Sequence, residues 1–295
     1  MIKGMVRVLQ GAGRLSAFGV LMLATACASS VDESQDSEES SVTTEGIIGG
    51  SNAVAGGHPW IVRLFNNTSS PAGKCAGTLI SASWVLTAAH CVTGSGNAAA
   101  SPFNIYMYLG DYDTSGFGAP GEGGNWEQGK FASQVIIHPS YSGTNHDIAL
   151  VKLETPALLN QRVKTIPLNT SNITSGTGIA AGWGATATLN PLDPTKLEST
   201  ILKRAELTVR SAATCNATEL SSNHTLASDE MCAGNANGNP STCFGDSGGP
   251  FIRPVGSGHQ LIGVTSWGSH YCTTYVVFSR ISSHLNWIRG IVPGV

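Results

Sequence analysis

A serine set among small and turn-forming residues is the first feature of the sequence that could do chemistry. Ser247 lies in TCFGDSGGP, directly after Asp246 and before two glycines. Small neighbours let backbone N–H groups approach a substrate carbonyl, as the binding of a tetrahedral oxyanion requires. A serine hydroxyl is a poor nucleophile until a base takes its proton. This chemistry therefore needs a histidine and an orienting acid from elsewhere in the chain.

Two other segments offer such residues. His90 ends an apolar run in TAAHC, and Asp147 opens DIAL. Taken singly, His90 fits a hydrogen-bonded core histidine and Asp147 fits a turn residue. Together with Ser247, they are the residue types that an acyl-transfer site combines.

The elements that must position these residues are strands. From Ile47 onward, short apolar segments alternate with clusters of Gly, Asn, Ser and Pro, a spacing that favours antiparallel β-structure. The segments are 60–65, 77–90, 103–110, 131–139, 147–153, 178–184, 201–209, 249–254, 259–268 and 275–281. Only the end of the chain, SSHLNWIRGIV, predicts a helix, with Leu285, Ile288 and Val292 at helical spacing. The 36 glycines and the charged fraction of 12% also favour a turn-rich β protein.

The motifs TAAHC, DIAL and GDSGGP, in this order, resemble the three signatures of chymotrypsin- and trypsin-like serine proteases. The resemblance extends from Ile47 to the C-terminal helix. It implies an all-β fold of two six-stranded antiparallel β-barrels, roughly 47–170 and 171–280, followed by a C-terminal α-helix. The catalytic site is then expected in the cleft between the barrels.

The resemblance also implies a role for each site residue. His90 would act as general base, Asp147 would fix its tautomer, and Ser247 would form the acyl-enzyme. The N–H groups of Gly245 and Ser247 would form the oxyanion hole. Ser266 would support Asp147 and bind substrate backbone.

A precursor is implied by the sequence Ile47-Ile48-Gly49-Gly50, which resembles the activation sequence of the family. After cleavage, the new ammonium of Ile47 would pair with Asp246. The preceding residues, Thr44-Glu45-Gly46, do not end in Arg or Lys. A trypsin-like activator is therefore not expected, and the activating protease stays unidentified.

Seven cysteines leave one odd cysteine in the chain. If processing consumes Cys27, the other six can form three disulfides in an exported body, with 15 connectivities open from spacing alone. No cysteine or histidine spacing of a zinc site appears. The family resemblance implies the pairs Cys75–Cys91, Cys215–Cys232 and Cys243–Cys272.

The primary pocket of the family predicts an apolar substrate residue before the scissile bond. The residues that the resemblance assigns to this pocket are Ser241, Phe244, Ser266, Trp267, Gly268 and Val276. Ser241 stands where an Asp would select Lys or Arg, and burying an ammonium without a partner costs several kcal/mol. Gly268 leaves one wall open, but Val276 would shorten the pocket. We therefore expect Leu, Met, Ala or Val, with Phe and Tyr less favoured.

The N-terminal segment has the layout of an exported protein. Residues 1–26 read as a signal peptide, with basic residues before the apolar run LSAFGVLMLATA. Cys27 fits a bacterial lipoprotein signal incompletely, so lipidation and simple secretion both stay open. Residues 27–46 are acidic and Ser-rich, and they read as a tether or a propeptide of the domain 47–295. We expect a secreted or cell-envelope protein.

The charge of the domain bears on its partners. Residues 47–295 carry 13 basic and 13 acidic residues without a basic run, which excludes nucleic acid as the partner. No cofactor is expected, although Asp111 and Glu127 could hold calcium, and the chain is expected to be monomeric with protein or peptide substrates. The rival functions are a catalytically inactive homologue that binds a partner, an esterase or lipase, and a surface adhesin.

Overall fold

The computed structural model describes residues 47–68, 73–115, 126–187, 198–217 and 225–295. The predicted signal peptide 1–26, Cys27 and the acidic segment 27–46 lie outside the described residues. Among the residues described, no helix has the length and apolar character needed to cross a membrane.

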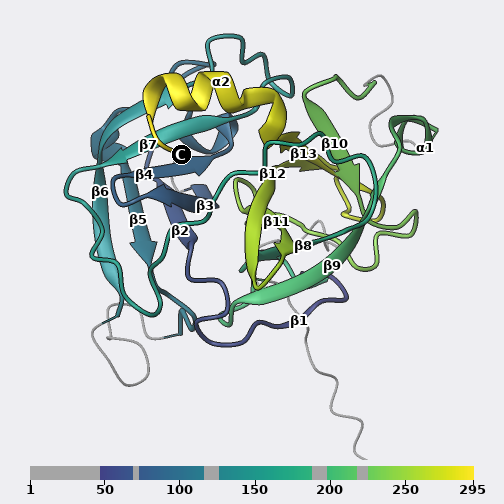
Figure 1. The fold of residues 1–295 in the computed structure, drawn as a ribbon, viewed down its shortest axis with the longest axis horizontal. Coiled ribbons are helices and arrows are strands. Elements are labelled where there is room, and N and C mark those ends of the chain that lie inside the picture. The colour runs from purple at the N-terminus through teal and green to yellow at the C-terminus, as the bar shows by residue number, and fades with distance from the viewer. Residues whose placement is uncertain (1–46, 69–72, 116–125, 188–197, 218–224) are drawn as a thin grey trace, which may run out of the picture. The chain divides into compact units, whose positions relative to one another are not determined.

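Six antiparallel strands close the first barrel in the order β2-β3-β4-β7-β6-β5 (Figure 1). Their bounds are β2 Ile61–Asn66, β3 Gly73–Ser81, β4 Trp84–Thr87, β5 Ile105–Leu109, β6 Gln128–Ile137 and β7 Ala149–Leu153. Alternate residues of a strand point to opposite faces, so Ile105, Met107 and Leu109 of β5 are buried inside this barrel.

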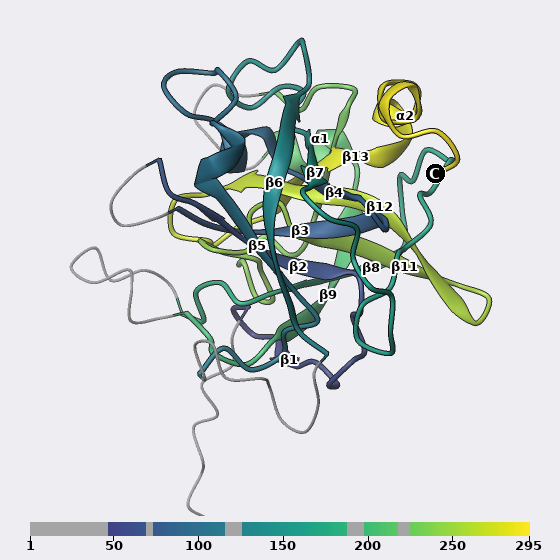
Figure 2. The same cartoon turned by 90° about the vertical axis from the view of Figure 1, so that its left-hand side faces the viewer.

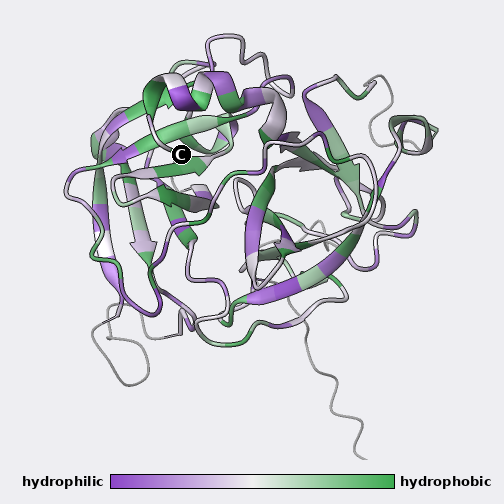
Figure 3. Ribbon diagram, viewed as in Figure 1, coloured by the Kyte–Doolittle hydropathy of each residue, from purple (hydrophilic) through white to green (hydrophobic). Residues whose placement is uncertain are grey.

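The second barrel consists of β9-β10-β13-β12-β11-β8 and closes where β8 pairs with β9. Its strands are β8 Thr177–Gly182, β9 Lys203–Arg210, β10 Glu230–Ala233, β11 Pro250–Val255, β12 Gly258–Gly268 and β13 Val276–Arg280, and β1 Ser51–Asn52 adds to β9. Along β9, buried Ala205, Leu207 and Val209 alternate with more polar residues, as the changing colours of Figure 3 show. The predicted fold of two six-stranded barrels is confirmed.

The chain continues directly from β13 into α2, Ile281–Ile291 (Figure 2). Leu285, Ile288 and Val292, which predicted the helix, are buried in one hydrophobic cluster with residues of the first barrel. The C-terminal helix therefore joins the end of the second barrel to the core of the first.

Several short elements were not predicted from the sequence. They are α1 Ala212–Asn216, β1, β10, and the 3-10 helices η1 Ala89–Val92 and η2 Pro102–Asn104. None exceeds five residues, so each is too short for its hydrophobic pattern to indicate a helix or a strand. The expectation that only the chain end is helical was wrong, because Ser211 caps the single-turn helix α1 by accepting the Thr214 N–H.

Candidate active site

His90 lies on η1, immediately after the end of β4. Cys91, next in the chain, is disulfide-bonded to Cys75 on β3. The side chain of Asn66 donates to the backbone carbonyls of Cys91, at 3.1 Å, and Thr93, at 2.9 Å. These contacts hold the backbone around His90 from two neighbouring strands.

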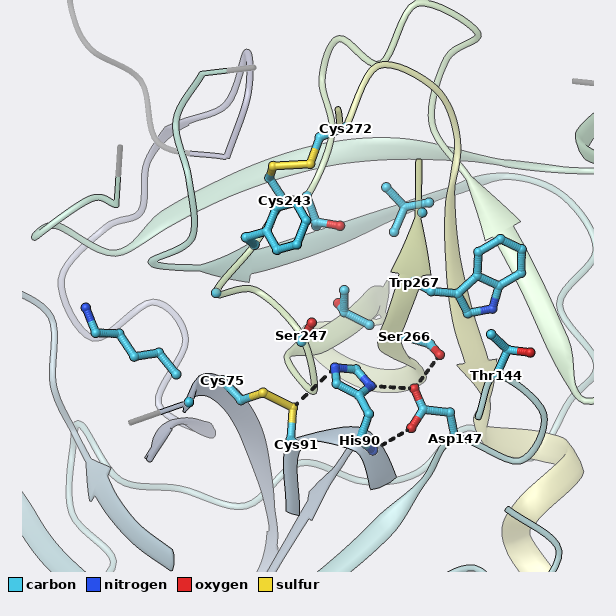
Figure 4. A pocket seen from close by; sticks show the side chains of 18 of the residues that line it. Cys75, His90, Cys91, Thr144, Asp147, Cys243, Ser247, Ser266, Trp267 and Cys272 are labelled. Atoms are coloured by element: carbon cyan, nitrogen blue, oxygen red, sulfur yellow. Dashed lines mark hydrogen bonds and ion pairs between the residues drawn. A yellow bond between two sulfur atoms is a disulfide. The ribbon is translucent and has the colours of Figure 1, made fainter. Parts of the chain in front are cut away.

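Asp147 is almost completely buried, with 1% of its surface exposed. Its Oδ1 accepts the backbone N–H of His90 at 2.9 Å, and its Oδ2 lies 2.7 Å from His90 Nδ1 (Figure 4). Burial alone would lower the pKa of His90, but the charge of Asp147 and this hydrogen bond outweigh burial and raise it. A proton on Nδ1 leaves Nε2 free to accept another.

Ser266 donates from its hydroxyl to Asp147 Oδ2 at 2.6 Å (Figure 4). Its position follows from an irregularity between β12 and β13, where Thr265 pairs with Phe278 but Trp267 pairs with Val277. Ser266 is thus the extra residue of a bulge, a feature that redirects side chains next to active sites. Ser279 also holds Asp147, because its hydroxyl donates to the Asp147 backbone oxygen at 2.6 Å. Sequence reasoning missed Ser279, whose only signal is a hydroxyl within the buried run of β13.

Ser247 lines the same cavity as His90 and precedes β11 (Figure 4). The next residue, Gly248, has φ +77°, and a Cβ there would overlap Thr87 Oγ1 and the Ala76 carbonyl. The Ala76 N–H donates to the backbone carbonyl oxygen of Ser247 at 2.7 Å, which holds this turn against the first barrel. His90 Nε2 lies 3.7 Å from Cys91 Sγ and makes no hydrogen bond to Ser247 within the described residues. Such bonds are often long before substrate binds.

Two backbone N–H groups beside the Ser247 side chain are available to a ligand. Within the described residues, neither Gly245 nor Ser247 uses its N–H in a hydrogen bond, and Gly245 has φ +95°. Asp246, between them, is fully buried and accepts the N–H groups of Gly184, at 2.8 Å, and Cys243, at 2.9 Å. Burial raises the pKa of Asp246 to about 7 despite these two bonds.

Known proteins are similar to this chain in sequence. The profile of one family, described as Trypsin, matches residues 47–288. Trypsin I-P1 of Gallus gallus is 33% identical over 248 residues, which cover 82% of this chain and 88% of that protein. The chain belongs to the trypsin family. It is therefore a serine endopeptidase, as the sequence motifs predicted.

Relatives of this peptidase also include a coagulation factor and a CLIP domain-containing serine protease. Coagulation factor IX of Oryctolagus cuniculus is 31% identical over 252 residues, covering 82% of each chain. The CLIP domain-containing serine protease B15 of Anopheles gambiae is 29% identical over 255 residues, which cover 80% of this chain and 67% of that protein.

The site lies in a cavity of about 890 Å³ whose walls come from both barrels of the peptidase. All six residues predicted for the primary pocket line it, joined by Tyr275, which sequence reasoning missed. Ser241 is fully buried, with its hydroxyl bound to the Thr242 carbonyl at 3.0 Å, and Val276 is 4% exposed. Phe244 is half exposed and its ring meets that of His270 edge to face, at 5.7 Å.

Three disulfides link the cysteines of the peptidase body. The pairs are Cys75–Cys91, Cys215–Cys232 and Cys243–Cys272, the same as those implied by the family resemblance. The first joins β3 to the segment of His90, and the last joins two walls of the cavity.

The predicted calcium site of the peptidase finds little support at Asp111. Its Oδ2 lies 2.6 Å from Arg63 Nη1, so a calcium ion at this carboxylate would face a guanidinium charge. Most of the loop between Asp111 and Glu127, residues 116–125, lies outside the described residues. Calcium binding stays an untested prediction.

Ile47 is fully buried and packs in the core cluster of the second barrel. Its neighbour Ile48 accepts the Ser241 N–H at 3.0 Å, so the start of the peptidase domain pairs with the floor of the pocket.

Proposed function

We propose that this peptidase cleaves proteins after apolar residues, and that it is exported as a precursor activated by a cut before Ile47. The observation that carries the specificity is the lack of a free carboxylate in the cavity. Of the described residues that line it, only Asp147 carries a carboxylate, which is held by His90 and Ser266. A Lys or Arg side chain of the substrate, buried in this cavity, would have no free carboxylate to pair with, and burying its charge unpaired costs several kcal/mol.

In the proposed mechanism, Nε2 of His90 takes the proton of Ser247 as its oxygen attacks the substrate carbonyl. The N–H groups of Gly245 and Ser247 hold the oxyanion, at typically about 3 to 4 kcal/mol for one donor. His90 then protonates the leaving amine, and water hydrolyses the acyl-enzyme by the same route. The positions of His90, Gly245 and Ser247 around one cavity support these roles.

Activation by a freed Ile47 ammonium has support in the burial of both proposed partners. Ile47 and Asp246 are fully buried. The pKa of Asp246, raised to about 7 in the intact chain, would fall beside an ammonium, because an opposite charge favours the ionised carboxylate. That ion pair would fix the turn that carries Gly245.

We further propose that the enzyme acts outside the cytoplasm, as a monomer without a cofactor. Its three disulfides fit an oxidising compartment. Lipidation at Cys27 and simple secretion are the two alternatives. The mass of the mature N-terminal peptide distinguishes them, since a lipid adds to Cys27 only in the first.

Protein with its N-terminus set at Ile47 tests the proposal on a peptide library, with Ser247→Ala as the control. We expect cleavage after Leu, Met, Ala or Val that is absent in the variant. Cleavage after Lys or Arg would overturn the assignment of Ser241 and Val276. If no peptide is cleaved, the proposed specificity is overturned and the alternative of an inactive homologue that binds a partner is favoured.

A further inference from the structure

Three histidines and an aspartate meet beside Asp147. They are His138, which follows β6, His146, which precedes Asp147, His284 on α2, and Asp229, which precedes β10. One possible ligand atom from each histidine lies within 4.8 Å of the other two. Among the described residues that line the catalytic cavity, none belongs to this cluster.

Asp229 Oδ2 is the point where two of the imidazoles converge. His146 Nδ1 lies 3.1 Å from it and His284 Nε2 lies 3.4 Å from it. Neither nitrogen has the alignment of a hydrogen bond, so both are buried polar atoms without a hydrogen-bond partner. Ligands about 2.0 to 2.1 Å from a tetrahedral zinc ion lie roughly 3.4 Å apart. These contacts therefore have the spacing of neighbouring ligands.

His138 is the third histidine of the cluster, and it contacts both of the others. Its ring stacks on His146, with centroids 4.7 Å apart and planes 13° apart, and meets His284 edge to face at 5.2 Å. Its Nδ1 accepts the Ser140 N–H at 3.2 Å, on an exposed turn. Binding a metal through Nε2 would move the proton to Nδ1 and displace this one weak contact.

The charges of the cluster suit a cation. Asp229 places a carboxylate next to the imidazoles, and the nearby guanidinium of Arg280 donates its hydrogen bonds to Asn172, Ile173 and the Glu230 backbone. Imidazole nitrogens are preferred ligands of zinc and related metals.

We propose that His138, His146 and His284 bind one divalent transition-metal ion of the zinc class, with the Asp229 carboxylate next to two of the imidazoles. His284 is 2% exposed, and a metal would satisfy its otherwise unpartnered nitrogen. The other group of possible ligands, Cys75, His90 and Cys91, offers no thiolate, because its cysteines form a disulfide.

Titration of the full chain carrying Ser247→Ala with Co²⁺ tests this site without self-digestion. We expect one ion per chain, a visible spectrum of four-coordinate cobalt, and its displacement by Zn²⁺. His138→Gln and His284→Asn should each weaken binding at least about tenfold. His90→Gln, which removes the catalytic imidazole outside the cluster, should leave binding unchanged.

Circular dichroism and the Tm establish that each variant is folded. His138 is only half-buried, so His138→Gln decides the matter if His284→Asn fails to fold. Absence of saturable binding, equal affinity in His138→Gln, or loss of binding in His90→Gln would each overturn the proposal.

Discussion

At the scale of single residues, the carboxylate of Asp147 organises the site. It accepts the backbone N–H of His90 and the Ser266 hydroxyl, and it lies 2.7 Å from His90 Nδ1. Because both oxygens are held, the carboxylate has little freedom to leave the imidazole. The His90 ring is thereby fixed in one tautomer, and its positive form is stabilised.

The pH dependence of kcat/KM should report this arrangement. His90 is a base only when neutral, and its pKa is raised above 6.5, so activity should rise with pH through a midpoint above 6.5. In Asp147→Asn, the charge that opposes burial is gone. The midpoint should move to lower pH, while kcat falls on the order of 10⁴-fold. An unchanged midpoint in this variant would contradict the role of Asp147.

Asp246 should affect the intact precursor and the mature enzyme in opposite ways. Its folded-state pKa of about 7 lies above the ordinary 3.8. Between about pH 4 and pH 7, the unfolded chain ionises while the folded chain stays protonated, so the precursor should lose up to roughly 4 kcal/mol of stability as pH rises. Asp246→Asn cannot ionise, and its precursor should show no such loss.

In protein that begins at Ile47, the same substitution should abolish peptidase activity and lower the Tm, because the ammonium loses its partner. Urea unfolding of the precursor from pH 4 to pH 8, with Ser247→Ala present in both chains, measures the stability effect. Equal pH slopes with and without the Asp246→Asn substitution would count against a raised pKa.

The residues that could be predicted from the sequence are polar ones in apolar surroundings, such as His90 and Asp147. Ser279 could not be predicted, because its contact with the Asp147 backbone joins the two barrels across 132 residues of sequence. The place of Tyr275 in the pocket could not be predicted either, because it depends on a bend of the chain between Cys272 and β13 that the local sequence does not indicate. The residues of the proposed metal-binding cluster come from α2 and three loops, so their spacing in the sequence could not reveal it.

At the scale of elements, strands place the site residues just beyond their ends or at irregularities. His90 follows β4, Asp147 precedes β7, Ser247 precedes β11, and Ser266 is the bulged residue of β12. The regular strands could be predicted, because their apolar residues alternate over enough positions. The bulge could not, because it arises from the registry of β12 against β13.

At position 248, directly after Ser247, the turn can accept only glycine. In Gly248→Ala, the new methyl group would overlap Thr87 Oγ1 and the Ala76 carbonyl, at φ +77°. Gly256→Ala is a matched control, because Gly256 has φ +57° but nothing within 4 Å of a Cβ. The control should cost about 1 kcal/mol for backbone strain alone.

Gly248→Ala should cost clearly more than this in urea unfolding, and it should also lower kcat, because the nucleophile moves. Equal losses of stability in the two variants would show that the overlap with the first barrel is relieved without consequence.

At the scale of the whole peptidase body, the cavity depends on the fit between two barrels. His90 and Asp147 come from the first, whereas Ser247 and the pocket residues come from the second. The Ala76 N–H donates to the backbone carbonyl of Ser247, and the Ser279 hydroxyl donates to the backbone carbonyl of Asp147, so hydrogen bonds cross between the barrels at both Ser247 and Asp147. The pocket that selects the substrate is built on this joint framework.

Val276 should set the depth of that pocket. It is 4% exposed on β13 and lines the cavity. Val276→Gly removes an isopropyl group of three carbons, so the ratio of kcat/KM for Phe over Leu substrates should rise at least about tenfold, because even one methylene in an apolar pocket has an effect of that order.

Val277→Ala is the matched control, because its side chain is equally buried and does not itself line the cavity, although it packs in one cluster with Cys215, Cys232 and Tyr275. It should lower the Tm and leave the Phe to Leu ratio unchanged. Both substitutions remove methyl groups from the same strand, so a ratio that changes in Val276→Gly alone reports pocket depth, whereas an equal change in both would attribute selectivity to the packing of β13.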